Sequence, residues 1–508
     1  MKEGNAVSTD TARPAPAGAS GQSWNMIFRT ERARPARIRT MRGGWWLAIA
    51  TVCFGAFMGQ LDASIATLTY PALRTQFHAG LAAVSWVSLA YLLTLVALLV
   101  PVGRLSDVHG RKLLYLYGFI VFTAASAACG LAPSLTALIG FRVVQAFGAA
   151  LLQANSVALV TTSAPPRATR LALGMQAGAQ AVGLALGPTL GGLLTASVGW
   201  RYVYWVNVPV GVAAIVAGRY LLPRTRHFSR TGSFDWLGTA LLALCTTALL
   251  LAVSAASGLR MPGWAVLALA AVAGASAAAF AARQLRARVP LIPKPLLRSA
   301  RLGLGLCGAL AGYLVLFGPL VLVPQVLGGG SELRAGLILS ALPVGFGLAA
   351  LAGEAVLPKS WGNRQRGIAG GLACAAAMLA LIVVPLSAVD LAGLLAVAGL
   401  GLGTFVPANN TVIMGASPGA TAGVLGGLVN MARGIGTALG ISVVTLALHL
   451  APRVSIVPGR PAGPDPRPAL AMLALTALAA AFTALAGRAG TPAGPGAGAG
   501  EERPGAFG

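Results

Sequence analysis

The chain has 508 residues, of which 56% are hydrophobic and only 10% are charged, and its mean hydropathy is +0.77. Soluble domains carry roughly 25% charged residues, so this composition excludes an ordinary soluble protein. The formal net charge is +25, yet the Lys and Arg residues fall mostly on one side of the apolar segments given below. Because such an excess marks the cytoplasmic side of a membrane protein, we interpret the charge as a topology signal and predict no nucleic-acid partner.

Apolar segments recur along the chain at the length that a helix needs to cross a membrane, roughly 20 residues for a hydrocarbon core of about 30 Å. They predict an all-α polytopic membrane protein with about fourteen transmembrane helices and both termini in the cytoplasm. The heavy use of Ala, Gly and Arg is typical of a GC-rich bacterial genome, so the predicted location is a bacterial plasma membrane. The predicted spans are 45–72, 81–103, 113–132, 135–161, 170–197, 201–222, 236–256, 264–283, 302–327, 332–357, 367–388, 390–414, 418–448 and 468–487.

The order of spans and connectors divides the chain into two similar parts. Six spans, an inserted pair and six further spans follow one another, and transporters are commonly built from repeated halves with the substrate site between them. We expect a monomer embedded in the lipid bilayer. The predicted divisions are a disordered basic tail over 1–42, a six-helix bundle over 43–222, an inserted helix pair with basic connectors over 223–301, a second six-helix bundle over 302–487 and a disordered tail over 488–508.

Asp62 lies within the first span. An acid in a membrane span is costly, and such residues commonly serve a function. Loss of hydration disfavours the charged form, so the protonation of Asp62 becomes sensitive to nearby charge, as proton coupling requires. It shares a helical face with Thr51, Gly55, Met58 and Thr69, which favours a cavity wall over a lipid contact. The alternative is a structural carboxylate that a neighbouring helix satisfies.

Arg142 in the fourth span shares a helical face with Gln145 and Gln153. Arginine stays charged in proteins, so its side chain must face protein, water or a counter-ion. We predict that Arg142 assists proton coupling and that the two amides contact substrate. A fixed staple between helices remains the alternative for Arg142.

The connector between the second and third spans reads Gly-Arg-Leu-Ser-Asp-Val-His-Gly-Arg-Lys over 103–112. Gly103 and Gly110 permit close packing and positive φ, and Asp107 can accept hydrogen bonds from an arginine or from the exposed amides of a helix N-terminus. An ordinary basic turn would explain Arg111 but not the acid between two glycines. In the fifth span, Pro188 removes a backbone hydrogen bond, and four glycines form a groove: Gly183, Gly187, Gly191 and Gly192.

These stretches resemble a known family. The 103–112 connector is similar to the cytoplasmic signature of the major facilitator superfamily. The 183–192 run resembles the GxxxGPxxGG signature of its drug:proton antiporters, and the 142–148 run resembles the family's span-four motif. Three more stretches are similar to the fourteen-helix branch of this family: 61–65, 200–209 and 234–238.

The resemblance implies alternating access and export of lipophilic, in many members cationic, compounds against proton entry. By that resemblance Asp62 and Arg142 couple protons, Asp107 and Arg111 latch the two halves together, and the fifth-span glycines with Pro188 shape the antiporter seal. A proton-coupled metabolite importer and a lipid flippase of the same fold are the alternatives. The polar candidates for the substrate cavity are Gln145, Gln153, Asn207, Asn409, Asn430 and Arg433. For Arg433 we favour a structural contact within the second half over a substrate role.

Two features depart from the family pattern. One is the absence of a second mid-membrane acid of the kind that promotes recognition of divalent cations in some relatives, which argues against broad cation specificity. The other is the connector of the second half. The second-half counterpart of the 103–112 connector, residues 353–366, has lost the acid-glycine order, and Glu354 in it reads as a surface carboxylate. The five cysteines lie inside spans without CxxC spacing, so we predict packing roles and no metal site. The sequence contains no nucleotide-binding P-loop, so we predict no enzyme and no cofactor, with a proton gradient as the energy source.

Overall fold

The structure is a computed structural model, and it describes residues 31, 34–41, 43–225, 234–256, 261–327, 332–384, 387–416, 421–454 and 463–486. The tail predicted at 488–508 lies outside the described residues, and so does the tail predicted at 1–42 apart from 31 and 34–41. Within the latter, residues Ala36–Thr40 form a short helix, α2.

Thirteen described helices are long and apolar enough to cross a membrane, which confirms the predicted all-helical membrane fold. A helix satisfies its backbone hydrogen bonds within the segment, as the hydrocarbon core demands. These helices are α3 (Trp45–Ile65), α5 (Leu81–His109), α6 (Arg111–Gly130), α7 (Leu135–Ser163), α8 (Thr169–Ser197), α11 (Trp236–Ala256), α12 (Gly263–Arg286), α14 (Ala300–Leu327), α15 (Glu332–Val356), α16 (Asn363–Val383), α17 (Ala388–Met414), α18 (Ala422–Leu450) and α19 (Arg467–Ala486).

The predicted span at 201–222 takes a different form. It consists of α9 (Arg201–Trp205) and α10 (Asn207–Leu221), which are interrupted at Val206, so neither piece reaches a spanning length alone. The predicted first span also ends early, because α3 stops at Ile65. The remaining short elements are η1 (Ala66–Thr69), α4 (Tyr70–Phe77), η2 (Pro166–Ala168), α13 (Lys294–Leu297) and the paired strands β1 (Arg453–Val454) and β2 (Gly463–Pro464).

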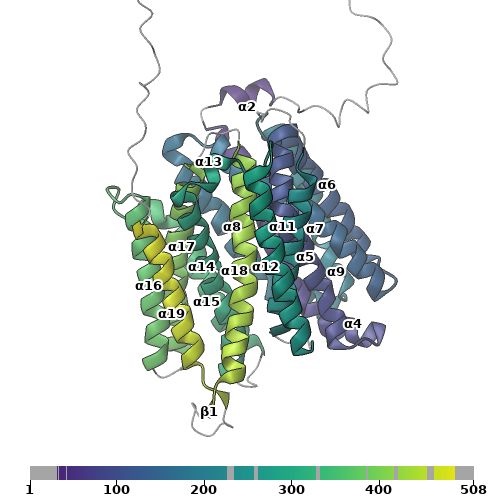
Figure 1. The fold of residues 1–508 in the computed structure, drawn as a ribbon, viewed down its shortest axis with the longest axis vertical. Coiled ribbons are helices and arrows are strands. Elements are labelled where there is room, and N and C mark those ends of the chain that lie inside the picture. Colours follow the sequence, from purple (N-terminus) through teal and green to yellow (C-terminus); the bar gives the residue numbers. More distant parts are fainter. Residues whose placement is uncertain are drawn as a thin grey trace, which may run out of the picture.

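Two large apolar cores lie side by side in the molecule. One is built around Tyr115, Phe119 and Phe122 of α6 with residues of α3, α5 and α7. The other is built around Phe346 of α15 and Phe405 of α17, with residues of α14, α16 and α19. Figure 1 shows α16, α17 and α19 at one side of the molecule and α6, α7 and α9 at the other. The helices therefore gather into two bundles. We call α3 to α10 the first bundle and α14 to α19 the second bundle.

The pair α11 and α12 packs beside the junction of the two bundles. Leu250 of α11 contacts a small cluster that includes Val96 of α5 and Ala438 of α18. Only 11% of the apolar stretch of α12 is buried inside the protein, and its Trp264 and Leu267 are exposed. In a bilayer such apolar exposure is favourable, because lipid tails are as apolar as the side chains.

Figure 1 places α2 and the β1–β2 pair at opposite ends of the molecule. The end that carries α2 is called the α2 end below. By the distribution of basic residues, we predict that the α2 end faces the cytoplasm.

Candidate functional site

The carboxylate of Asp62 is fully buried inside the first bundle. Its Oδ2 accepts a hydrogen bond from Nη1 of Arg142 at 2.6 Å. Its Oδ1 accepts from Nε2 of Gln145 at 2.9 Å and from Nδ2 of Asn207 at 3.2 Å. Three donors on two other helices therefore surround this acid, and that arrangement suits its ionised form.

Arg142 connects this acid to the space between the bundles. Besides Asp62, its Nη1 donates to Oε1 of Gln145 at 2.6 Å, and its Nε donates to the carbonyl oxygen of Val87 at 3.1 Å. The guanidinium lies over the ring of Tyr91, 4.2 Å from its centroid, and the same side chain lines the central cavity. Asp62 is not among the residues that line that cavity, whereas its ion-pair partner Arg142 is.

The helical face of α3 that carries Asp62 is not the cavity wall that the sequence led us to expect. Thr51, Met58 and Thr69 on this face are buried within the first bundle, and a Cβ at Gly55 would collide with the Tyr115 side chain. The cavity side of α3 is formed by Gly59, Gln60 and Ala63 instead. The prediction was wrong because a small, polar stripe also suits close packing against neighbouring helices.

The central cavity has a volume of about 220 Å³ and lies between the two bundles. Its walls come from α3, α5, α7 and α8 of the first bundle and from α14 and α18 on the other side. Apolar side chains of α5 form much of the wall, and in the described part of the chain the charged residues that line it are Arg142 and Arg433.

The structure divides the predicted substrate-cavity residues into two groups. Gln153, Asn430 and Arg433 line the cavity. Gln145 and Asn207 do not line it, because their amides are used by Asp62. Asn409 lies elsewhere in the second bundle, where its Nδ2 donates to the carbonyl oxygen of Gly305 at 2.9 Å.

Sequence reasoning missed the polar contact that crosses the cavity. The hydroxyl of Tyr313 on α14 donates to Oε1 of Gln180 on α8 at 3.1 Å, and both residues line the cavity. A tyrosine and a glutamine in separate apolar spans give no sign in the sequence that they meet.

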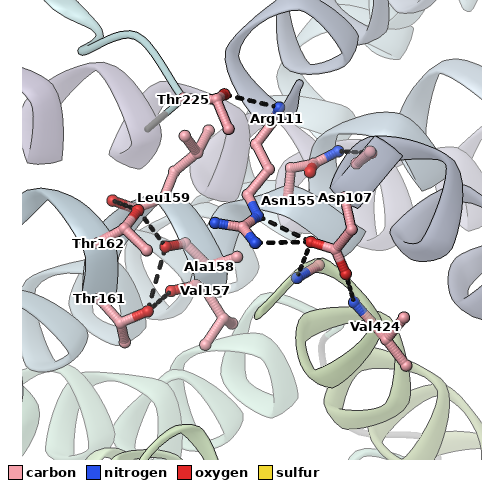
Figure 2. Close-up of polar contacts among 12 residues, drawn as sticks. Asp107, Arg111, Asn155, Val157, Ala158, Leu159, Thr161, Thr162, Thr225 and Val424 are labelled. Carbon is pink, nitrogen blue, oxygen red and sulfur yellow. Dashed lines mark hydrogen bonds and ion pairs between the residues drawn. The ribbon is translucent and has the colours of Figure 1, made fainter. Parts of the chain in front are cut away.

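At the α2 end, Asp107 joins the two bundles, as Figure 2 shows. Its Oδ1 accepts from Nε and Nη2 of Arg111 at 3.0 and 2.7 Å. Across the interface, the backbone nitrogens of Gly423 and Val424 donate to Asp107 at 2.8 and 3.0 Å. These amides lie in the first turn of α18, where unpaired N–H groups and the helix dipole favour an anion.

The local backbone explains how the acid reaches α18. Helix α5 continues to His109 rather than ending near residue 103, so Asp107 is helical and not part of a loop. Only Gly110 separates α5 from α6, with φ of 107°, a conformation that glycine adopts at little cost. A Cβ at Gly103 would collide with the carbonyl oxygen of Gly423, so this glycine permits the two backbones to approach.

A second polar contact joins the bundles at the same end. Arg170 of α8 forms an ion pair with Glu354 of α15, with its Nη2 3.1 Å from Oε2, and its Nη1 donates to Oδ1 of Asn363 at 3.0 Å. Arg366 of α16 also lies 3.4 Å from Glu354. The expectation that Glu354 is a plain surface carboxylate was therefore wrong, since the connector kept an acid in reach of the opposite bundle.

The fifth-span glycines face α3. A Cβ at Gly183, Gly187 or Gly191 would collide with Phe57, Ser64 or Leu68, respectively, whereas nothing lies within 4 Å of a Cβ at Gly192. The predicted groove is thus filled by α3 close to Asp62. The side chain of Pro188 lies outside the described residues.

Comparisons with known proteins agree with this architecture. The family model "Major Facilitator Superfamily" matches residues 52–441. The "Tetracenomycin C resistance and export protein" of Streptomyces glaucescens is 32% identical over 427 residues, 82% of this chain and 78% of that protein. The "Riboflavin transporter RibZ" of Clostridioides difficile is 29% identical over 408 residues, 78% of this chain and 86% of that protein.

The likeness extends to solved structures. The human organic anion transporter MFSD10 matches with a TM-score of 0.62 over 87% of this chain and 99% of that chain. At 17% identity, this match bears on the fold alone. With its helices in two bundles around a central cavity and a family match over most of its length, the chain is a multi-pass membrane transporter, not an enzyme, and belongs to the major facilitator superfamily.

Proposed function

We propose that the protein exports lipophilic small molecules across the cell membrane by alternating access, driven by the entry of protons. The observation that carries this proposal is the buried pair of Asp62 and Arg142, whose arginine lines the central cavity. A fully buried acid close to a cavity inside the membrane is costly to maintain, and proton coupling would give this acid a function.

Proton coupling follows from the hydrogen bonds of Asp62. When the acid is ionised, it neutralises Arg142, whose Nη1 lies 2.6 Å from Oδ2 of Asp62. When the acid takes up a proton, Arg142 loses its counter-ion and both side chains must rearrange, because an unpaired buried charge is strongly destabilising. Protonation can thus favour one arrangement of the first bundle over another, and such a difference is all that coupling to transport requires.

The contacts at the α2 end supply the switching element. Asp107 with the start of α18, and Arg170 with Glu354, hold the two bundles together there. For the cavity to open at that end, both contacts must break. Both contacts are formed in the described structure, which supports its assignment as the state closed at the α2 end.

The apolar wall of the cavity supports a lipophilic substrate, and the relatives bear on the direction of transport. The cavity wall is mainly apolar, with Leu92, Leu95 and Leu99 among its residues, which suits a lipophilic compound. A relative is a resistance and export protein, and this favours export. A riboflavin transporter among the relatives favours metabolite transport as the second candidate.

Proteoliposomes provide the test. Purified protein is reconstituted with an imposed pH gradient, and uptake of tetracenomycin C and of riboflavin is measured in separate experiments. We expect gradient-driven movement of the lipophilic compound against proton flow, its loss in Asp62→Asn, and its retention in Asp390→Asn, which changes an exposed acid at the start of α17. Gradient-driven antiport that survives in Asp62→Asn would remove this acid from the mechanism, and riboflavin flux in the same direction as protons would establish the second candidate.

A further inference from the structure

Among the residues that the structure describes, one cation that lines the central cavity has no acid beside it. Arg433 of α18 is 5% exposed and lines the cavity. Its Nη1 donates to Oδ1 of Asn430 at 3.2 Å, and its guanidinium lies 5.0 Å from the centroid of the Tyr313 ring. Among the residues that the structure describes, none forms an ion pair with it, and its buried Nε has no hydrogen-bond partner.

The other cation that lines the cavity, Arg142, is neutralised by an acid. Arg142 is paired with Asp62 at 2.6 Å, so that pair is neutral as a unit. None of the described residues that line the cavity is Asp or Glu. In the described state the cavity therefore carries one net positive charge, and that charge belongs to Arg433.

The position of Arg433 is fixed by its neighbours. Nδ2 of Asn430 donates to the carbonyl oxygens of Gln153 at 2.8 Å and of Gly426 at 2.9 Å. Both amide hydrogens of Asn430 are thus used, which leaves its Oδ1 for the guanidinium. The Nε donor of Arg433 is buried and has no hydrogen-bond partner among the described residues. Such a donor is costly, and the asparagine oxygen and the tyrosine ring beside the guanidinium do not neutralise its charge.

We propose that this cavity selects lipophilic organic monoanions, and that Arg433 binds their anionic oxygen. A guanidinium recognises a carboxylate or an enolate through charge-assisted hydrogen bonds. The stacked rings of Tyr313 and Phe317, 6.2 Å apart, and the leucines of α5 form an apolar surface for the rest of such a molecule. An organic cation finds no counter-charge here, so the inference goes against the cationic substrates that the family resemblance implies.

The preference for organic monoanions specifies the substrate class of the proposed transporter, and it rests on that proposed function. It also limits how anion binding can be coupled to proton entry. Protonation of Asp62 would free the charge of Arg142 in the same cavity, so an anion would not be repelled by the protonated state. Exchange of anion for proton must then rest on the preference of each loaded state for one orientation of the bundles rather than on charge repulsion at one site.

The test uses three probes with one ring system: 2-naphthoate, 2-naphthamide and 2-naphthylmethylammonium. Binding to the full-length protein in nanodiscs is measured by equilibrium dialysis. A hydrogen bond to a charged group contributes enough for a preference of about 10-fold to 100-fold. We expect the wild type to bind naphthoate tighter than naphthamide by this factor, and the ammonium most weakly.

Variants assign the preference to the residue. Arg433→Gln should bind naphthoate and naphthamide equally, whereas Arg433→Lys, which keeps the charge, should retain part of the preference. Arg467→Gln, which removes an exposed arginine at the start of α19, should behave as the wild type. Equal binding of the three probes by the wild type, tighter binding of the ammonium, or an unchanged preference in Arg433→Gln would each overturn the inference.

The outcome is separable from that of the transport experiment. A protein that prefers naphthoate but moves no compound against a proton gradient would refute the proposed function and leave the anion site standing. A protein that exchanges neutral or cationic compounds for protons without any anion preference would refute the site alone.

Discussion

Asp107 is expected to control how much of the protein is closed at the α2 end. The carboxylate accepts two hydrogen bonds from Arg111 within the first bundle and two from backbone nitrogens at the start of α18. Only the last two cross between the bundles, and only they must break when the α2 end opens. Replacement of Asp107 by Asn keeps the size of the side chain and removes its charge.

The free energy that the closed state loses in Asp107→Asn follows from those two hydrogen bonds. A hydrogen bond to a charged group contributes roughly 1.5–3 kcal/mol, and a charge at a helix N-terminus contributes about 0.3–1 kcal/mol. An Asn retains one acceptor oxygen, so we expect the closed state to lose about 3 kcal/mol. This corresponds to a shift of roughly 100-fold in the equilibrium, which would change a population of about 99% closed to about half closed.

Distance measurements between spin labels would report this shift. Arg167 and Lys359 are exposed near the ends of the first and second bundles that meet at the α2 end, and both can be replaced by labelled cysteines after the five native cysteines are removed. We expect a single distance in the parent protein and a second, longer distance in Asp107→Asn. Asp390→Asn serves as the control for the loss of one exposed acid. A distance distribution that Asp107→Asn leaves unchanged would refute the assignment of Asp107 as a latch.

Three further predictions concern the same contacts. Gly103→Ala should shift the spin-label distances toward the open state, because the added methyl group collides with the α18 backbone; unchanged distances would show that the interface relaxes. Glu354→Gln should shift them less than Asp107→Asn does, because its pair with Arg170 is about a quarter exposed (26% and 29%) and exposed pairs contribute about 0–1 kcal/mol. In thermal unfolding in detergent, Asp62→Asn should lower the midpoint by leaving Arg142 uncompensated at a cost of about 3–5 kcal/mol, and the additional change Arg142→Gln should recover much of that loss; additive losses would refute the coupling of the pair.

The sequence by itself determined the class of molecule. The repeated apolar segments of about 20 residues left a bilayer as the only environment in which the chain can bury them, and thirteen of the predicted spans correspond to single spanning helices. The isolated acid and arginine in apolar spans, Asp62 and Arg142, were identified for the same reason, since each is too costly in hydrocarbon without a role. The role of each in proton coupling remains a proposal.

The tertiary structure alone decided which polar groups meet. Gln145 and Asn207 looked like cavity residues because the helical period fixes only the face on which a side chain lies, and not the helix that packs against that face. The structure shows them bound to Asp62 instead. Likewise, the pairing of Asp107 with α18 joins residues more than 300 positions apart. That no described acid lies beside Arg433 can be recognised only from its neighbours in space.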